Sequence, residues 1–144
     1  MPKNMKVYRY MSFEEFNNMS TGMDMYPRTW KHKAKTNSTG FCFLPEQVRM
    51  HDDGDIVMLS PLDCLRFLRG IVSEDVLVEF EAPEAAFRQT EGSYASTFSD
   101  DWEAFCSIEE LCCDSYNRDT FVPLRYMPEP DYWCAAQREW YQYN

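Results

Sequence analysis

Alternation of apolar and polar side chains predicts the main β-strands of this chain. Residues 6–11 place Val7, Arg9 and Met11 on one face of an extended segment and two tyrosines on the other, and residues 76–81 alternate in the same way. Short apolar runs predict further strands over residues 40–44, 56–59, 111–113 and 120–126. The run over residues 56–59 is either a strand or an extended lead-in to a helix.

Capping signals predict the first helix. The capping box that runs from Ser12 to Glu15 indicates a helix over residues 13–19, because a serine hydroxyl and a glutamate three residues later satisfy the first backbone N–H groups of a helix. Three apolar side chains at helical spacing are expected to face inward: Phe13, Phe16 and Met19.

Two more helices are expected further along the chain. Ser60 as the N-cap and Pro61 at the first helical position open a helix that continues to about residue 69. Aromatic and small residues on one face indicate a C-terminal helix over about residues 132–142, and the spacing within residues 102–108 is that of a helix or a turn. The inner stripe of the second helix has four members: Leu62, Leu65, Leu68 and Val72.

The order of these elements predicts an α+β fold. Strands are not regularly separated by crossover helices, so we expect mixed or antiparallel sheets with short helices, in a single domain over residues 1–144. Residues 20–39 form a long polar segment with five basic side chains around Trp30. This segment is either a loop that closes over an anionic ligand or a solvated loop that balances an acidic protein.

Composition narrows the class of protein. The chain has 144 residues, of which 44% are hydrophobic and 16% aromatic, enough for one sizeable core. No apolar run reaches the roughly 18 residues of a membrane span, and no signal peptide opens the chain, so we expect a cytoplasmic protein. Six cysteines are then expected to be thiols, and no metal site is expected because Cys112 and Cys113 are adjacent rather than spaced as a zinc knuckle.

Charge is distributed unevenly along the chain. The formal net charge is -10, yet residues 1–50 carry eight Lys/Arg against four Asp/Glu, while residues 51–144 carry six against twenty. An acidic protein repels nucleic acid, so direct nucleic-acid binding is disfavoured and a protein target is expected.

Several common catalytic motifs are missing from the sequence. It contains no G-x-x-x-x-G-K-[ST], G-x-G-x-x-G, G-x-S-x-G or H-E-x-x-H segment, which removes support for the hydrolase and kinase classes. The two histidines, His32 and His51, lie in polar sequence and are interpreted as surface residues.

Three short motifs occur in an order that resembles the ADP-ribosyltransferase superfamily. Arg9 lies in the first strand, Thr-Asn-Ser-Thr-Gly-Phe-Cys-Phe occupies residues 36–43, and Glu109 and Glu110 precede the late strand at residues 111–113. The resemblance spans residues 5–126. It implies a protein that binds NAD as a substrate and transfers ADP-ribose to a macromolecular target.

The resemblance also implies roles for individual residues. Arg9 would contact NAD, Ser38, Thr39 and Phe43 would hold its nicotinamide side, and Glu110 would bind the nicotinamide ribose as the catalytic carboxylate. Breakage of the nicotinamide–ribose bond passes through an oxocarbenium-like state, which one positioned carboxylate stabilises. The structural alternatives are an ion pair for Arg9, a turn for Ser38 and a solvated charge for Glu110.

A second hypothesis rests on acidic residues alone. Carboxylates arranged like a phosphate backbone would let the chain block a nucleic-acid-binding protein, as phage anti-defence or anti-CRISPR proteins do. Glu79 and Glu81 are interpreted as the outer face of a half-exposed strand within that surface. The four groups of acidic residues are 52, 53 and 55; 79, 81 and 84; 100, 101 and 103; and 109, 110 and 114.

Overall fold

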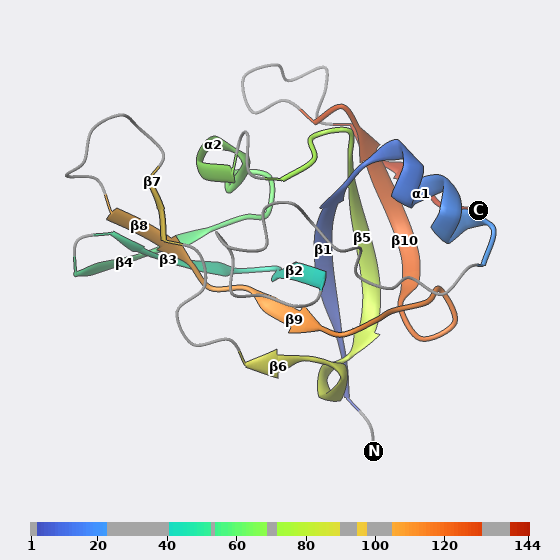
Figure 1. Cartoon of the computed structure of the whole chain (residues 1–144), viewed down its shortest axis with the longest axis horizontal. Helices are drawn as coiled ribbons and strands as arrows, with labels where there is room; N and C mark the ends of the chain where they lie inside the picture. The colour runs from blue at the N-terminus through green and yellow to red at the C-terminus, as the bar shows by residue number, and fades with distance from the viewer. Residues whose placement is uncertain are drawn as a thin grey trace.

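Two antiparallel sheets and two short helices make up the described part of the protein (Figure 1). The computed structural model describes residues 3–22, 41–52, 54–68, 72–89, 95–97, 105–130 and 139–144. Each pairing between neighbouring strands in these residues is antiparallel. The α+β class expected from the sequence is therefore confirmed, with antiparallel strands.

The larger sheet has seven strands within the described residues. In spatial order these are β11 (Tyr141–Gln142), β10 (Val122–Pro128), β5 (Val76–Pro83), β1 (Asn4–Met11), β2 (Phe41–Pro45), β9 (Leu111–Cys113) and β6 (Arg88–Gln89). The strands β1 and β5 pair along their whole length, from Asn4 opposite Pro83 to Met11 opposite Val76. This long pair forms the centre of the sheet.

The smaller sheet has four strands within the described residues. Their order is β4 (Asp55–Leu59), β3 (Val48–Asp52), β8 (Phe105–Ile108) and β7 (Ala95–Thr97). The two sheets are joined where β2 leads into β3 and where β8 leads into β9, so Glu109 and Glu110 lie at the junction. The strand at residues 56–59 is confirmed, whereas β3 was not predicted and the helical or turn spacing over residues 105–108 is wrong.

Helix α1 (Phe13–Ser20) forms as the capping box predicts. The Ser12 side chain accepts a hydrogen bond from the Glu15 backbone N–H at 3.1 Å. Met19 is buried and Phe16 packs on the core, but Phe13 is 42% exposed, so its expected inward position is wrong.

The second helix is shorter than the sequence predicts. Helix α2 (Leu65–Leu68) has one turn, and residues 61–64 before it are hydrogen-bonded turns, in which the Ser60 hydroxyl accepts from the Asp63 N–H at 3.1 Å. The four residues of the expected stripe all pack on one core, but only Leu65 and Leu68 lie in the helix. A 3₁₀ turn, η1 (Glu84–Ala86), follows β5.

The predicted C-terminal helix is wrong at its end. Tyr141 and Gln142 form strand β11, which pairs with Arg125 and Tyr126 of β10. Residues 132–138 of that prediction lie outside the described residues, as do most of the polar segment over residues 20–39.

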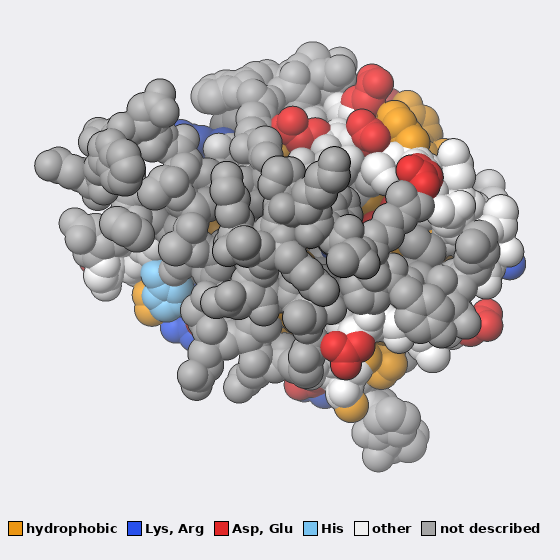
Figure 2. Space-filling view, in the orientation of Figure 1, with side chains coloured by type: hydrophobic (Ala, Val, Ile, Leu, Met, Phe, Trp, Pro, Cys, Tyr) orange, Lys and Arg blue, Asp and Glu red, His pale blue; other side chains and the backbone are white. Residues whose placement is uncertain are grey.

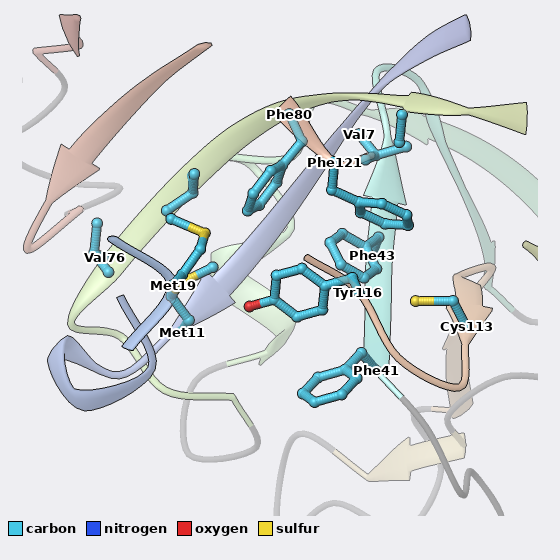
Figure 3. Packing of buried hydrophobic residues seen from close by; sticks show 12 residues of the cluster. Val7, Met11, Met19, Phe41, Phe43, Val76, Phe80, Cys113, Tyr116 and Phe121 are labelled. Carbon is cyan, nitrogen blue, oxygen red and sulfur yellow. The ribbon is translucent and has the colours of Figure 1, made fainter. Parts of the chain in front are cut away.

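Each face of the large sheet covers its own core. The aromatic face buries one cluster, which Figure 3 shows and which includes Phe41, Phe43, Phe80, Tyr116 and Phe121 with Met19 of α1. The aliphatic face buries the other, which includes Tyr8, Tyr10, Leu44, Leu65, Leu68, Leu77 and Ile108. Val7 and Met11 belong to the first cluster, so the two faces predicted for β1 are confirmed. In the described residues, no helix is long and apolar enough to span a membrane.

Candidate functional site

Arg9 is held in place by three hydrogen bonds. Its Nε and Nη2 atoms donate to the Glu15 carboxylate at 2.7 and 2.9 Å, and Nη1 donates to the Cys42 carbonyl at 2.9 Å. Strand β1 pairs with β2 at Val7 and Tyr8, and Arg9 reaches the Cys42 carbonyl just beyond this pairing. The guanidinium also lies 4.9 Å from the ring centroid of Phe41.

Glu15 reaches Arg9 because the helix cap positions it. It is the third helical residue after Ser12, and its carboxylate binds Arg9 and also accepts a hydrogen bond from the Tyr116 hydroxyl at 2.6 Å. The side chains of Arg9 and Glu15 are 15% and 14% exposed. Burial alone would lower the pKa of Arg9, but the charge and hydrogen bonds of Glu15 raise it above its ordinary value, so the guanidinium stays protonated.

Glu110 lies immediately before β9 and is buried, with 6% of its surface exposed. Burial raises its pKa well above the ordinary value of a glutamate, the charge of Cys42 and a hydrogen bond with Cys42 raise it further, and the positive charge of Arg9 lowers it. Arg9 and Glu110 are therefore close enough to interact electrostatically. Glu110 is not the solvated charge that the structural alternative expected.

The neighbouring Glu109 has a different environment. It forms ion pairs with Arg49 at 3.6 Å and with His51 at 3.3 Å, and all three side chains are about half exposed. This explains the adjacent glutamates of the sequence: one faces solvent on the smaller sheet, and the other faces the interior at the junction of the sheets. His51 is a surface residue as predicted, although it lies in strand β3 rather than in a loop.

Two cysteines lie beside Glu110. Cys42 of β2 and Cys112 of β9 are directly opposite each other in the sheet, and their sulfur atoms are 3.3 Å apart. The four cysteines whose side chains are described, Cys42, Cys64, Cys112 and Cys113, are all outside disulfides, so the expectation of thiols is confirmed for them. The sequence analysis missed the Cys42–Cys112 pair, because the register that joins them is not visible in either strand alone.

The structure corrects the role expected for Phe43. Its ring is 1% exposed, and its centroid lies between 5.1 and 5.8 Å from those of four other aromatic residues. Phe43 is therefore a core residue with no ring face available to nicotinamide. Ser38 and Thr39, the other two residues expected on that side of NAD, lie outside the described residues.

A second buried network lies on the aliphatic face. Glu79 accepts hydrogen bonds from the Tyr8 hydroxyl at 2.7 Å and from Arg125 at 2.9 Å, and the Arg125 guanidinium lies 4.4 Å from the ring centroid of Trp140. The prediction of a half-exposed face is wrong for Glu79, which is buried beneath Tyr8 and Arg125, whereas Glu81 is exposed. The sequence signal that could have predicted the burial of Glu79 is its position within a strongly apolar strand.

Among the described residues, the acidic groups predicted from the sequence do not make up one exposed surface. Glu79 and Glu110 are buried, Glu109 is in ion pairs, and Glu84 lies 3.9 Å from Lys3. On the side shown in Figure 2, some of the coloured acidic side chains lie near one another at the upper right and the others lie apart from them. For the acidic residues outside the described part, which include Asp100, Asp101 and Glu103, phosphate mimicry stays a prediction.

Comparisons with known proteins identify no relative of this chain. No protein-family model, curated protein or solved structure matches the chain.

Proposed function

We propose that this protein binds NAD and transfers its ADP-ribose group to a macromolecular target. The observation that carries the proposal is the strand order β1, β2, β9 in the larger sheet. The three segments that resemble ADP-ribosyltransferases are far apart in sequence, yet they belong to these three adjacent strands: Arg9 in β1, residues 36–43 leading into β2, and Glu110 at the start of β9.

The charged groups at the site support the same proposal. Burial and Cys42 raise the pKa of Glu110, and the protonated guanidinium of Arg9 is close enough to oppose that rise. The known hydrogen bonds of Arg9 use three N–H groups, and a guanidinium has further N–H donors for a phosphate or ribose oxygen. Phe43 contributes nothing to this site, and the contact with nicotinamide stays the prediction made for Ser38 and Thr39.

The proposed reaction needs few protein groups. The bond between the nicotinamide nitrogen and the ribose C1′ breaks, and nicotinamide leaves with the bonding electrons. A nucleophile on the target then bonds to C1′ and releases its proton. Glu110 binds the ribose and stabilises positive charge that develops on it, while Arg9 holds the phosphates. Glu15 and Tyr116 act as positioning residues. Glu15 binds the Arg9 guanidinium, and Tyr116 binds the Glu15 carboxylate, so both act on the substrate only through Arg9.

Thermal unfolding with NAD tests the binding step. NAD at about a hundred times its dissociation constant is expected to stabilise the protein by about 2.7 kcal/mol, which raises the melting temperature by several degrees. Arg9→Lys is expected to abolish the increase. Arg125→Lys is the matched control, because Arg125 also binds a buried glutamate but lies on the opposite face of the sheet. These measurements are made with a metal chelator present.

Product analysis tests the transfer step. Incubation with labelled NAD and a cell lysate is expected to release nicotinamide and to label a protein or nucleic acid, and Glu110→Gln is expected to remove both signals. If millimolar NAD produces no melting shift and no label transfer, or if Arg9→Lys and Arg125→Lys respond to NAD alike, the proposal is wrong.

A further inference from the structure

Three side chains that can bind a metal ion lie close together at the junction of the two sheets. Cys42 and Cys112 face each other across β2 and β9, and Glu110 is two residues before Cys112 in the same segment. The two sulfur atoms and a carboxylate oxygen of Glu110 all lie within 4.8 Å of one another. Of these three residues, only Glu110 has a role in the proposed NAD reaction.

Strand alternation explains why these three side chains share one side of the sheet. Phe41 and Phe43 point into the aromatic cluster, so Cys42 between them points the other way. Cys113 belongs to the aromatic cluster too, as Figure 3 shows, and its neighbour Cys112 therefore faces the side of Cys42. Rigid strands thus hold the two thiols at a position that loops would not fix.

The chemistry of this set selects a borderline-soft divalent cation. Thiolates bind zinc well, whereas calcium and magnesium take oxygen ligands only. Sulfur atoms bound to a tetrahedral zinc ion at about 2.3 Å are about 3.8 Å apart. The Cys42 and Cys112 sulfurs, now 3.3 Å apart, therefore reach that spacing by small rotations of their side chains.

The surroundings suit three protein ligands and one open position. Glu110 and Cys112 are buried, while Cys42 is partly exposed, so solvent can reach the group at Cys42. Two thiolates and a carboxylate leave a single negative charge around a divalent ion, and the positive charge of Arg9, which lies on the aromatic face, is close enough to act on Glu110. Cys64, the other described thiol on the aliphatic face, belongs to the hydrophobic cluster there.

We infer that Cys42, Glu110 and Cys112 form a site for one zinc ion, with a solvent molecule as fourth ligand. The inference is independent of the proposed NAD chemistry, although the two share Glu110, so zinc and NAD are expected to compete. Sequence spacing had indicated no metal site because it considered only the adjacent pair Cys112 and Cys113. The pairing that matters joins cysteines seventy residues apart.

Titration of the reduced full chain with Co²⁺, a spectroscopic substitute for Zn²⁺, tests the site without NAD. One equivalent is expected to bind and to produce thiolate-to-cobalt charge-transfer absorption that Zn²⁺ removes. Cys42→Ser and Cys112→Ser are expected to lose that absorption. Glu110→Gln is expected to keep sulfur ligation but to bind at least about tenfold more weakly. Cys113→Ser is the matched control, because it changes the adjacent thiol on the other face.

A second measurement avoids variants that fail to fold. In the unsubstituted chain, Zn²⁺ is expected to protect Cys42 and Cys112 from alkylation, detected by mass spectrometry of peptides, and a chelator is expected to restore their reaction. The inference is overturned if Co²⁺ gives no sulfur absorption, if Cys112→Ser retains it, or if the two cysteines form a disulfide instead of binding metal under reducing conditions. Since NAD is tested with chelator and metal without NAD, either proposal can fail alone.

Discussion

The two faces of the central sheet each bury an arginine–glutamate pair, but in different ways. On the aromatic face Arg9 and Glu15 form two hydrogen bonds and are almost equally enclosed. On the aliphatic face one hydrogen bond joins Arg125 to Glu79, and the Arg125 side chain is 37% exposed while that of Glu79 is 4% exposed. The first pair is therefore a closed unit that fixes a cation near Glu110, and the second borders solvent beside Trp140.

The two hydrophobic cores beside these ion pairs also differ in how closely their polar and apolar contacts are connected. Aromatic rings from several strands and loops meet on the aromatic face, and Tyr116 connects them to Glu15 through its hydroxyl. The aliphatic face is filled mainly by leucine, isoleucine, valine and methionine side chains from α2 and the strands. Polar and apolar contacts are thus interlocked on the side that carries Arg9, which suits a charged group that must stay in one position.

Truncation of a core ring is expected to have the largest effect. Phe43→Ala should lower the free energy of unfolding by about 3–5 kcal/mol, because it empties the centre of the aromatic cluster, whereas Phe43→Leu should cost much less. Urea unfolding measures both. A change below about 1 kcal/mol for Phe43→Ala would mean that the ring does not support the core, and Leu68→Ala gives the corresponding value for the aliphatic face.

Removal of the two glutamates compares the ion pairs directly. Glu15→Ala should cost about 3–5 kcal/mol, because Arg9 and the Tyr116 hydroxyl remain buried without it. Glu79→Ala should cost about 1–3 kcal/mol, because Arg125 can reach water and mainly Tyr8 loses a partner. Equal costs in urea unfolding would show that the difference in exposure has no energetic consequence.

Alkaline pH is expected to weaken both faces. Burial raises the pKa of Tyr10 and Tyr116 above the ordinary value of 10.0, and it raises the pKa of the Cys64 thiol from 9.0 to about 12. Above pH 9 to 10 the unfolded chain therefore loses protons that the folded chain keeps. Stability that is fully present below pH 9 should fall as pH rises, by about 1.4 kcal/mol per pH unit for each group that titrates only when unfolded.

Variants of the two tyrosines assign this loss to a face. Tyr10→Phe and Tyr116→Phe should each reduce the slope of unfolding free energy against pH, measured by urea unfolding from about pH 8 to 11. Tyr116→Phe should also lower stability at neutral pH, since Glu15 loses a hydrogen bond. Unchanged slopes in both variants would contradict the raised pKa values.

Helix capping should give the smallest difference between the faces. Ser12→Ala should cost about 1 kcal/mol, because Ser12 caps an eight-residue helix that carries Glu15 and Met19. Ser60→Ala should cost less, because the hydroxyl accepts from Asp63 in a turn that precedes one helical turn. Thermal unfolding measures the loss of stability in the two variants, and a larger loss for Ser60→Ala would contradict this prediction.

Much of the candidate site could be predicted only as separate parts. The sequence indicated Arg9 and Glu110 through the order of short motifs, and both are found near each other. The resemblance assigned Phe43 to the nicotinamide side of NAD, and the sequence could not exclude this because a ring in a short apolar run has the same pattern in a core as in a binding site. It missed Glu15 and Tyr116, since their contacts with Arg9 and with each other join α1, β1 and the segment after β9.

The sequence by itself determined the elements whose causes are local. The two faces of β1, the cap at Ser12 and the stripe of α2 each depend on residues within a few positions of one another. Only the tertiary structure decided that Tyr8 and Arg125 bury Glu79 of β5, and that Cys42 lies opposite Cys112. The physical reason is that strand register and sheet order depend on contacts between distant segments, which no local pattern of side chains encodes.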